Sequence, residues 1–153
     1  LLSAYYVNEL VLNFMHRDDP QPELFTLYGD AIVALGHNED IAATLRDFEL
    51  EFLGLLGYAV NLGHEAGSHH EVDPDCHYDY RVEQGPVPVS RQEGPLVFRG
   101  SVLRAIAARQ FGDPDVLRAA NRLLREVITF HLGGKELQSR KVLREVHRGR
   151  ISR

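Results

Sequence analysis

Apolar residues recur at helical spacing through the first third of the chain and predict three helices. The run 2–16 is apolar around most of a helical circumference, which indicates a largely buried helix ended by the Asp-Asp-Pro run 18–20. Pro22 suits the first turn of a second helix, whose apolar positions continue until Gly36. A third helix begins at Ile41, ends before Gly57 and places its apolar residues on one face: Leu45, Phe48, Phe52 and Leu55 or Leu56.

The helical period disappears between about 63 and 100, where Gly, Pro, His and acidic residues are frequent. Alternation over 78–82 predicts a strand, and Gln84-Gly85-Pro86 can turn the chain into a second strand at 87–89. Pro86 and Pro88 cannot donate to a ladder, so this second strand is either an edge strand or no strand. The segment is predicted to be a loop with a small hairpin.

Helical spacing returns in the last third. Ser101 can cap a helix to about Phe111, and Asp113 with Pro114 begins a long helix to about Leu132. Gly133-Gly134 breaks the chain before a last helix that starts at Ser139. The predicted fold class is mainly α: one compact helical domain over 1–153 with a small irregular or β insertion at about 63–100.

Composition places the chain among globular proteins. Its 153 residues are 44% hydrophobic and 25% charged, and no stretch approaches the length of a membrane helix. The single cysteine, Cys76, cannot form an internal disulfide, which favours a reducing cytoplasm. The chain opens on Leu1 inside a predicted helix, without an initiator methionine, so we expect a fragment of a longer protein.

The net charge of −5 conceals an asymmetry along the chain. Residues 1–98 contain 17 Asp and Glu against four Arg, a net charge of −13. Residues 99–153 contain 13 Lys and Arg against five Asp and Glu, a net charge of +8. The C-terminal part can therefore attract polyanions.

Signatures of several enzyme classes are absent. The sequence has no Walker-type phosphate loop, no Gly-x-Ser-x-Gly elbow and no His-Glu-x-x-His helix. Gly133-Gly134-Lys135 follows a helix and lacks both the first glycine and the hydroxyl residue of a phosphate loop, so a helix-breaking turn explains it better. We expect neither catalysis nor a cofactor.

Five blocks, in this order along nearly the whole chain, resemble the RecO family. They are AYYVNEL at 4–10, ELFTLY at 23–28, LRDFELEFLGLLGYAVNL at 45–62, DPDVLRAANRLLR at 113–125 and HLGGKELQSRKVLRE at 131–145. RecO proteins begin with an OB-fold, a small β-barrel that binds oligonucleotides. That barrel is absent from this sequence, so the resemblance is to the C-terminal helical domain that follows it.

The resemblance implies a recombination mediator that works in DNA repair. RecO proteins bind single- and double-stranded DNA, pair with RecR, contact the acidic C-terminal tail of single-strand-binding protein, help to load RecA and anneal complementary strands. These functions imply a cytoplasmic, nucleoid-associated protein with no membrane partner. A purely structural helical interaction module remains an alternative.

Arg46 is the candidate for binding that acidic tail, together with Leu45, Phe48 and Phe52. A peptide that ends in an aromatic residue needs an apolar pocket for the ring and a cation for the terminal carboxylate, and Arg offers a bidentate fork. The alternative is that Arg46 pairs with Asp47 or Glu49 at the surface.

Basic residues of the C-terminal third are the candidates for binding the DNA backbone. Arg118, Arg122 and Arg125 share one helix face, and further cations follow. Such contacts neutralise phosphates without reading bases. The alternative is an ordinary solvated surface. The complete candidate set is Arg118, Arg122, Arg125, Lys135, Arg140, Lys141 and Arg144.

The insertion contains a group of possible metal ligands, from His64 to Asp79. Some RecO proteins hold zinc here with two Cys-x-x-Cys pairs, but this sequence has Glu65 and Ser68 at the first pair and no second pair after Cys76. We therefore predict a degenerate zinc-finger-like region without metal. A metal-dependent hydrolase built on this segment remains the alternative enzyme hypothesis.

Overall fold

The computed structural model describes residues 1–15, 21–37 and 40–151. The described elements follow the order α1, α2, α3, β1, β2, β3, α4, α5, α6. Their bounds are α1 Leu2–Phe14, α2 Pro22–Gly36, α3 Ile41–Leu55, β1 His77–Arg81, β2 Gly85–Val89, β3 Val97–Arg99, α4 Gly100–Ala107, α5 Pro114–His131 and α6 Gln138–Ile151.

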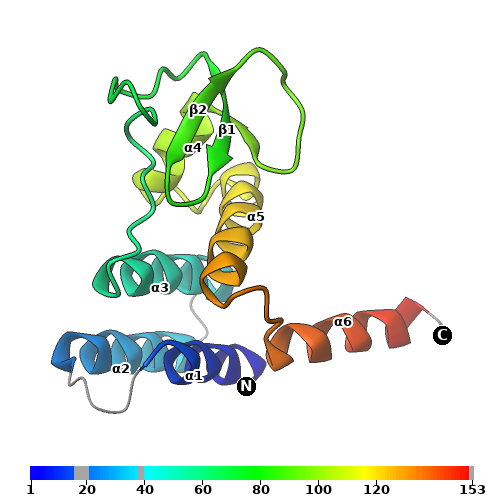
Figure 1. Cartoon of the computed structure of the whole chain (residues 1–153). Helices are drawn as coiled ribbons and strands as arrows, with labels where there is room; N and C mark the ends of the chain where they lie inside the picture. Colours follow the sequence, from blue (N-terminus) through cyan, green and yellow to red (C-terminus); the bar gives the residue numbers. More distant parts are fainter. Residues whose placement is uncertain (16–20, 38–39, 152–153) are drawn as a thin grey trace.

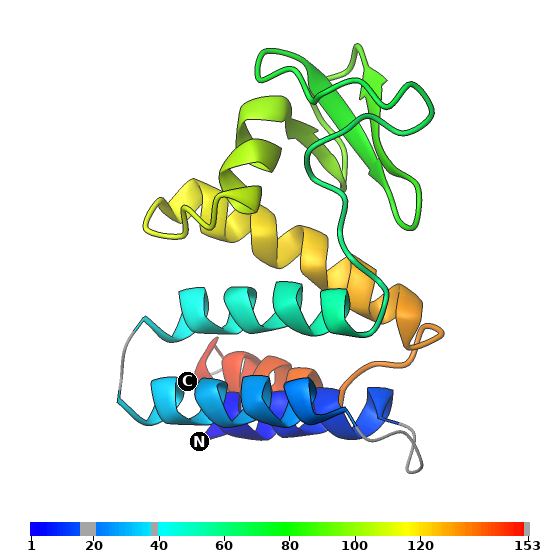
Figure 2. The ribbon, with the colours of Figure 1, turned by 90° about the vertical axis from the view of Figure 1, so that its left-hand side faces the viewer.

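The helices form layers, with the sheet at one end (Figure 1). Helices α1, α2 and α6 lie in one layer, and α3 lies above them (Figure 2). Helix α5 runs from α3 to the sheet, where α4 packs against it. Since α5 contacts both α3 and α4, it joins the N-terminal helices to the sheet.

The hydrophobic core follows the same path as α5. Its inner face buries Val116, Ala120, Leu123, Leu124, Val127 and Ile128. Fully buried residues of other elements complete this core, among them Val7 and Leu10 of α1, Phe52 of α3 and Ile106 of α4. Burying an apolar side chain stabilises the fold by about 1.5–3 kcal/mol, so the apolar face of α5 stabilises its packing on α3 and α4.

The insertion folds into a three-stranded antiparallel sheet in the order β2-β1-β3. In it, Tyr78 pairs with Pro88 on one side and with Phe98 on the other. Strand β2 is an edge strand, which is where its two prolines are tolerated. The prediction of a mainly α fold with a small β insertion after the third helix is therefore confirmed.

The predicted helix starts and stops agree with the structure at most of the described positions. The second and third helices have the predicted bounds, and the Asp113 carboxylate caps α5 by accepting from the Asp115 amide at 2.9 Å. The stop predicted at 18–20 lies outside the described residues.

Three local predictions were wrong. Ser101 does not cap α4, which begins at Gly100 directly after β3, and α4 ends at Ala107 rather than near Phe111. Strand β3 was not predicted, because three residues are too short to show alternation.

Gly100 has no room for a side chain, since a Cβ there would lie 1.8 Å from the Asp73 carbonyl oxygen.

Among the described helices, none is both long and apolar enough to cross a membrane.

Three buried tyrosines make the stability of this packing depend on pH. Burial raises the pKa of the Tyr6 phenol, and so does the nearby Glu49 carboxylate. Burial also raises the pKa of Tyr78 above 10.0, and it raises the pKa of Tyr80 to about 12. The fold thus favours the protonated form of each phenol.

We predict that the chain loses stability at alkaline pH. A phenol whose pKa is raised on folding contributes stability that is complete below its unfolded value of 10.0 and is lost as pH rises through the folded value. Urea unfolding at increasing pH should show the free energy of unfolding falling above pH 10. Ultraviolet absorbance should show the buried phenols ionising together with unfolding. A flat stability profile between pH 9 and 12 would contradict the prediction.

Candidate functional site

Arg46 lies on α3 and is largely enclosed by protein. Its side chain is 12% exposed and forms an ion pair with Glu49, one turn further along the same helix. The Glu49 side chain is 1% exposed, so this pair lies inside the protein and not at the surface. The alternative pairing of Arg46 with Glu49 is thus present, but in a buried setting.

Glu49 ties α3 to α1. Its carboxylate accepts a hydrogen bond from the Tyr6 hydroxyl at 3.0 Å. Burial raises the pKa of Glu49, while the Arg46 guanidinium and the Tyr6 hydrogen bond act in the opposite direction. A buried carboxylate needs such partners, because an uncompensated charge inside a protein is strongly destabilising.

Arg46 ties the same cluster to α5. Its guanidinium donates to the Asn121 side-chain carbonyl, so one arginine connects α3 with a helix 75 residues further along the chain. We call Tyr6, Arg46 and Glu49 the buried polar cluster, and the exposed Asn121 side chain extends its contacts to α5. Because these residues come from α1, α3 and α5, their contacts fix the three helices relative to one another.

A groove of about 270 Å³ opens beside the buried polar cluster. Helices α1, α3, α5 and α6 all contribute to its walls. We call it the arginine groove, and its lining residues are Leu2, Ser3, Tyr6, Leu45, Arg46, Asn121, Arg125, Arg140 and Leu143. The lining combines apolar side chains with three arginines and contains no Asp or Glu.

The arginines of the groove differ in how far they are already engaged. Arg46 is committed to Glu49 and Asn121. Arg140 donates to the Thr129 hydroxyl at 3.3 Å, and its guanidinium carbon lies 5.9 Å from the centre of the Tyr6 ring. Arg125 is exposed, and its guanidinium forms no hydrogen bond or ion pair with another described residue. Arg125 is therefore the cation most available to a ligand.

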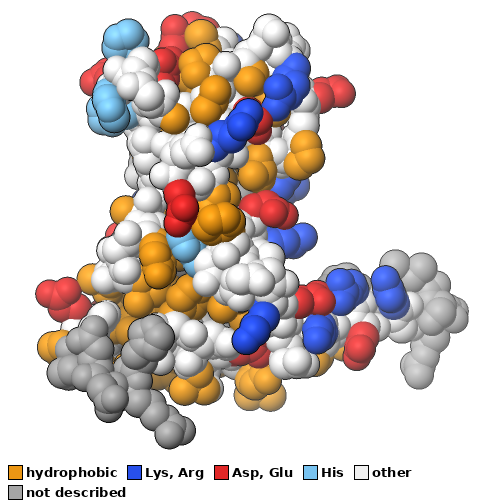
Figure 3. All heavy atoms as spheres, in the orientation of Figure 1, with side chains coloured by type: hydrophobic (Ala, Val, Ile, Leu, Met, Phe, Trp, Pro, Cys, Tyr) orange, Lys and Arg blue, Asp and Glu red, His pale blue; other side chains and the backbone are white. Residues whose placement is uncertain are grey.

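A second hollow of about 410 Å³ adjoins the groove. Arg125, Arg140 and Leu143 line both spaces. Arg144 lines the second one and forms an ion pair with Glu136 at 2.9 Å. Lys and Arg side chains gather along α6 on the face shown in Figure 3. The cations of α5 and α6 thus form a surface that continues from the groove.

The structure places two predicted DNA contacts elsewhere. Arg118 forms an ion pair with Asp115 at the start of α5. Arg122 donates to the Val97 carbonyl oxygen at 3.3 Å, and its guanidinium carbon lies 4.6 Å from the centre of the Phe98 ring. Both arginines are therefore occupied by the sheet end of α5. Lys135 lies between α5 and α6, Lys141 lies on α6, and neither has an ion-pair partner among the described residues.

Two residues of the predicted tail site do not line the groove. Phe48 and Phe52 stack on each other with ring centres 5.4 Å apart, and Phe52 is 0% exposed. They belong to the core beneath α3. Of the four residues predicted for this site, Leu45 and Arg46 reach the groove.

Sequence reasoning missed the contributions of Tyr6 and Asn121, and it placed the pairing of Arg46 with Glu49 at the surface. The signal for burial of Glu49 was present, since it is a charged residue between Phe48 and Phe52 on the apolar face of a predicted helix. A carboxylate in such a place requires buried partners. Tyr6 and Asn121 lie on other helices, 43 residues from Glu49 and 75 from Arg46, so no spacing rule could have identified them.

The insertion holds its loop through hydrogen bonds. The Glu65 carboxylate accepts from the Ser68 hydroxyl at 2.7 Å and from the Tyr78 hydroxyl at 3.0 Å. The Tyr78 oxygen in turn accepts from the Asp73 amide at 2.8 Å. His64, His69 and His70 are exposed on this loop. Histidine side chains are visible at the end of the molecule that carries the sheet (Figure 3).

Throughout the described residues, no group of three or more His, Cys, Asp and Glu side chains is placed to hold a metal ion.

Comparison with known proteins connects this structure to one family. The family described as Recombination protein O C terminal matches residues 1–141. Over 156 aligned positions the chain is 40% identical to the DNA repair protein RecO of Nitrosococcus oceani, covering 100% of this chain and 63% of that protein. It is 41% identical to the DNA repair protein RecO of an Azoarcus species, covering 95% of this chain and 62% of that protein. The chain thus spans somewhat less than two thirds of the length of these relatives.

We predict that Arg46→Ala destabilises the protein by about 3–5 kcal/mol, because it leaves the Glu49 carboxylate buried without its ion-pair partner. Urea unfolding measures this loss. Arg118→Ala, which removes an exposed ion pair, should change stability by less than about 1 kcal/mol. Equal effects of the two substitutions would show that the buried polar cluster does not hold the helices together.

Proposed function

The chain belongs to the RecO family, as the C-terminal part of RecO, and we propose that it acts in DNA repair as a non-catalytic adaptor. In this proposal the fragment holds the tail of single-strand-binding protein and the DNA backbone on neighbouring surfaces. The observation that carries the proposal is the arginine groove, in which cations and apolar side chains from four helices line one space without acidic residues.

The chemistry of the groove suits an acidic peptide with an aromatic C-terminus. Leu2, Leu45 and Leu143 offer an apolar surface for the aromatic ring. Arg125 is free to form a two-pronged contact with the terminal carboxylate, and Arg140 adds positive charge nearby. Arg46 acts indirectly in this arrangement, because its guanidinium is engaged by Glu49 and Asn121.

The DNA backbone is proposed to lie along the cations that continue from the groove over the second hollow. Arg125 and Arg140 line both spaces, Arg144 lines the second, and Lys135 and Lys141 lie nearby in sequence. These side chains can neutralise phosphates without reading bases. Arg118 and Arg122 contribute less, because both already have protein partners.

The proposed mechanism is tethering. A tail held in the groove and a strand held beside it raise the local concentration of each partner near the other, without any new chemical step. RecR and, through it, RecA would then be recruited to a strand that single-strand-binding protein covers. Pairing with RecR and strand annealing belong to the whole protein, of which this chain is a part.

We predict that a peptide with the acidic tail of single-strand-binding protein binds this chain and that Arg125→Ala weakens binding about tenfold or more, a loss of about 1.4 kcal/mol. Calorimetric titration measures the affinity. Arg125→Ala is a cleaner test than Arg46→Ala, because Arg125 supports no buried charge. Arg118→Ala, on the same helix but outside the groove, is the matched control and should bind like the unmodified chain. If the peptide binds the unmodified chain, Arg125→Ala and Arg118→Ala with equal affinity, the groove is excluded as its binding site.

We also predict salt-sensitive binding to DNA. The logarithm of the binding constant should fall linearly with the logarithm of salt concentration, by about 0.7 for each phosphate contacted on a single strand. The double substitution Lys135→Ala and Lys141→Ala should lower this slope and weaken binding to all sequences alike. Arg91→Ala, which removes a cation already paired with Asp79 on the sheet, is the control. If the unmodified chain, the double variant and Arg91→Ala show the same salt dependence of DNA binding, the chain is better explained as a purely structural module.

A further inference from the structure

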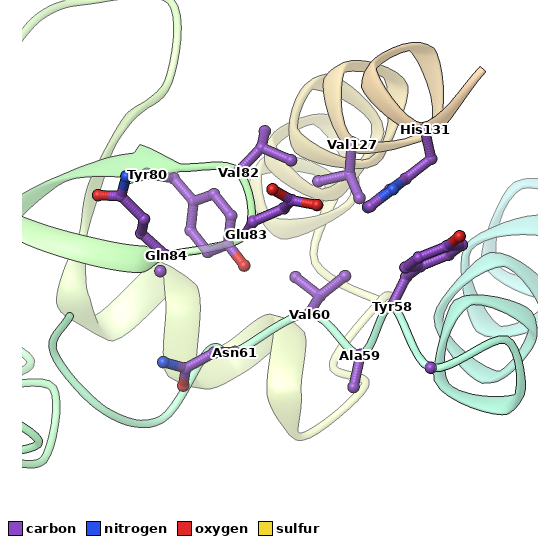
Figure 4. A pocket seen from close by; sticks show the side chains of 12 residues that line it. Tyr58, Ala59, Val60, Asn61, Tyr80, Val82, Glu83, Gln84, Val127 and His131 are labelled. Carbon is purple, nitrogen blue, oxygen red and sulfur yellow. The ribbon is translucent and has the colours of Figure 1, made fainter. Parts of the chain in front are cut away.

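A separate hollow of about 350 Å³ lies where the β1–β2 hairpin faces the end of α5 (Figure 4). The hairpin turn forms one wall, the segment 57–61 after α3 forms another, and α5 forms the third. We call it the hairpin pocket. The side chains that the argument uses are Tyr58, Val60, Val82, Glu83, Val127 and His131. Its volume falls in the range of small-ligand sites.

Glu83 gives the pocket its charge. Its carboxylate points from the turn toward Val127 and His131 of α5 (Figure 4). No described residue forms a hydrogen bond or ion pair with it, whereas Asp79 on the same hairpin pairs with both Arg81 and Arg91. The Glu83 backbone has φ 70°, a left-handed conformation that costs energy in a non-glycine residue. A strained turn therefore holds an unpaired carboxylate over the pocket.

An aromatic pair and apolar side chains surround this carboxylate. Tyr58 stacks on His131 with ring centres 4.0 Å apart and planes inclined by 19°. Tyr58 is nevertheless 42% exposed, so the stack leaves part of its ring accessible. Val60, Val82 and Val127 supply apolar contacts between the ring and the carboxylate. The pocket thus combines one acid, aromatic rings and an aliphatic wall.

The walls of the pocket are held in place before any ligand binds. A Cβ at Gly85 would lie 2.7 Å from the Asn61 side-chain nitrogen, so the hairpin turn and the segment 57–61 are in direct contact. The Asn61 side-chain amide donates to the His64 carbonyl oxygen at 2.9 Å. The Ala66 backbone amide donates to the Pro86 carbonyl oxygen at 2.8 Å. A preformed site loses less conformational entropy on binding.

We propose that the hairpin pocket binds the side chain of an arginine presented by a protein partner. The guanidinium matches a carboxylate with two parallel N–H donors and stacks on an aromatic ring. The aliphatic part of an arginine side chain packs on apolar walls. Glu83 supplies the carboxylate, Tyr58 the ring and the three valines the wall.

A protein fits this pocket better than a nucleic acid does. The one carboxylate in the pocket repels phosphates, and the chain up to Phe98 carries a net charge of −13. The free cations that suit a phosphate backbone line a separate hollow on another face of α5, around Arg125. The inference does not depend on the proposed function, because it concerns different residues and a ligand of opposite charge.

The test is a nuclear magnetic resonance titration of the isotope-labelled chain with the blocked tripeptide acetyl-Ala-Arg-Ala-amide. A citrulline tripeptide of the same shape but no charge serves as the matched ligand. We expect saturable shifts of the Tyr58, Glu83 and His131 resonances with the arginine peptide, and binding of the citrulline peptide at least about tenfold weaker. Glu83→Gln keeps the side-chain length and should weaken arginine binding by a similar factor, with an otherwise unchanged spectrum.

Glu93→Gln is the control variant, because Glu93 is an exposed acid of the loop before β3 and does not line the pocket. It should bind the arginine peptide like the unmodified chain. The proposal is overturned if neither peptide gives saturable shifts in the pocket, if both peptides bind equally, or if Glu93→Gln weakens binding as much as Glu83→Gln. It is also overturned if an oligothymidine strand shifts these resonances and the arginine peptide does not.

Discussion

The carboxylate of Glu49, buried where three helices meet, is the constraint on which the rest of the structure depends. A charge enclosed in this way is tolerated only with partners, and here it has the Tyr6 hydroxyl from α1 and the Arg46 guanidinium from its own helix. Arg46 then reaches Asn121 on α5. Apolar packing alone allows helices to slide, whereas these directional contacts permit one arrangement.

That arrangement creates the arginine groove. Tyr6, Arg46 and Asn121 line it from α1, α3 and α5, and α6 supplies the remaining wall through Arg140 and Leu143. The first turn of α6 is fixed to α1 because the Ser139 amide donates to the Glu9 carboxylate at 3.3 Å. Arg46 therefore has a structural task, while Arg125 and Arg140 are left for a ligand. The same contacts that stabilise the helices decide which cations remain free.

Helix α5 connects two surfaces of opposite character. One face of its C-terminal half carries the free cations around Arg125, and another face, at Val127 and His131, borders the hairpin pocket with the Glu83 carboxylate. This separation agrees with the opposite net charges of the two parts of the chain. An adaptor benefits from such an arrangement, because an acidic partner and a basic partner are drawn to different sites and do not compete.

The helices, the small β insertion and the exclusion of the proline-containing strand from the sheet centre could be predicted from the sequence, because they depend on local periodicity and on the missing proline amides. Arg46, Arg125 and Arg140 were singled out as well, but in two separate sets. The folded chain was needed to show that these three arginines line one groove, that Phe48 and Phe52 belong to the core, and that Arg122 contacts the sheet. Helix periodicity acts over a few residues, whereas the contact of Arg46 with Asn121 spans 75 positions and exists only once the core has packed.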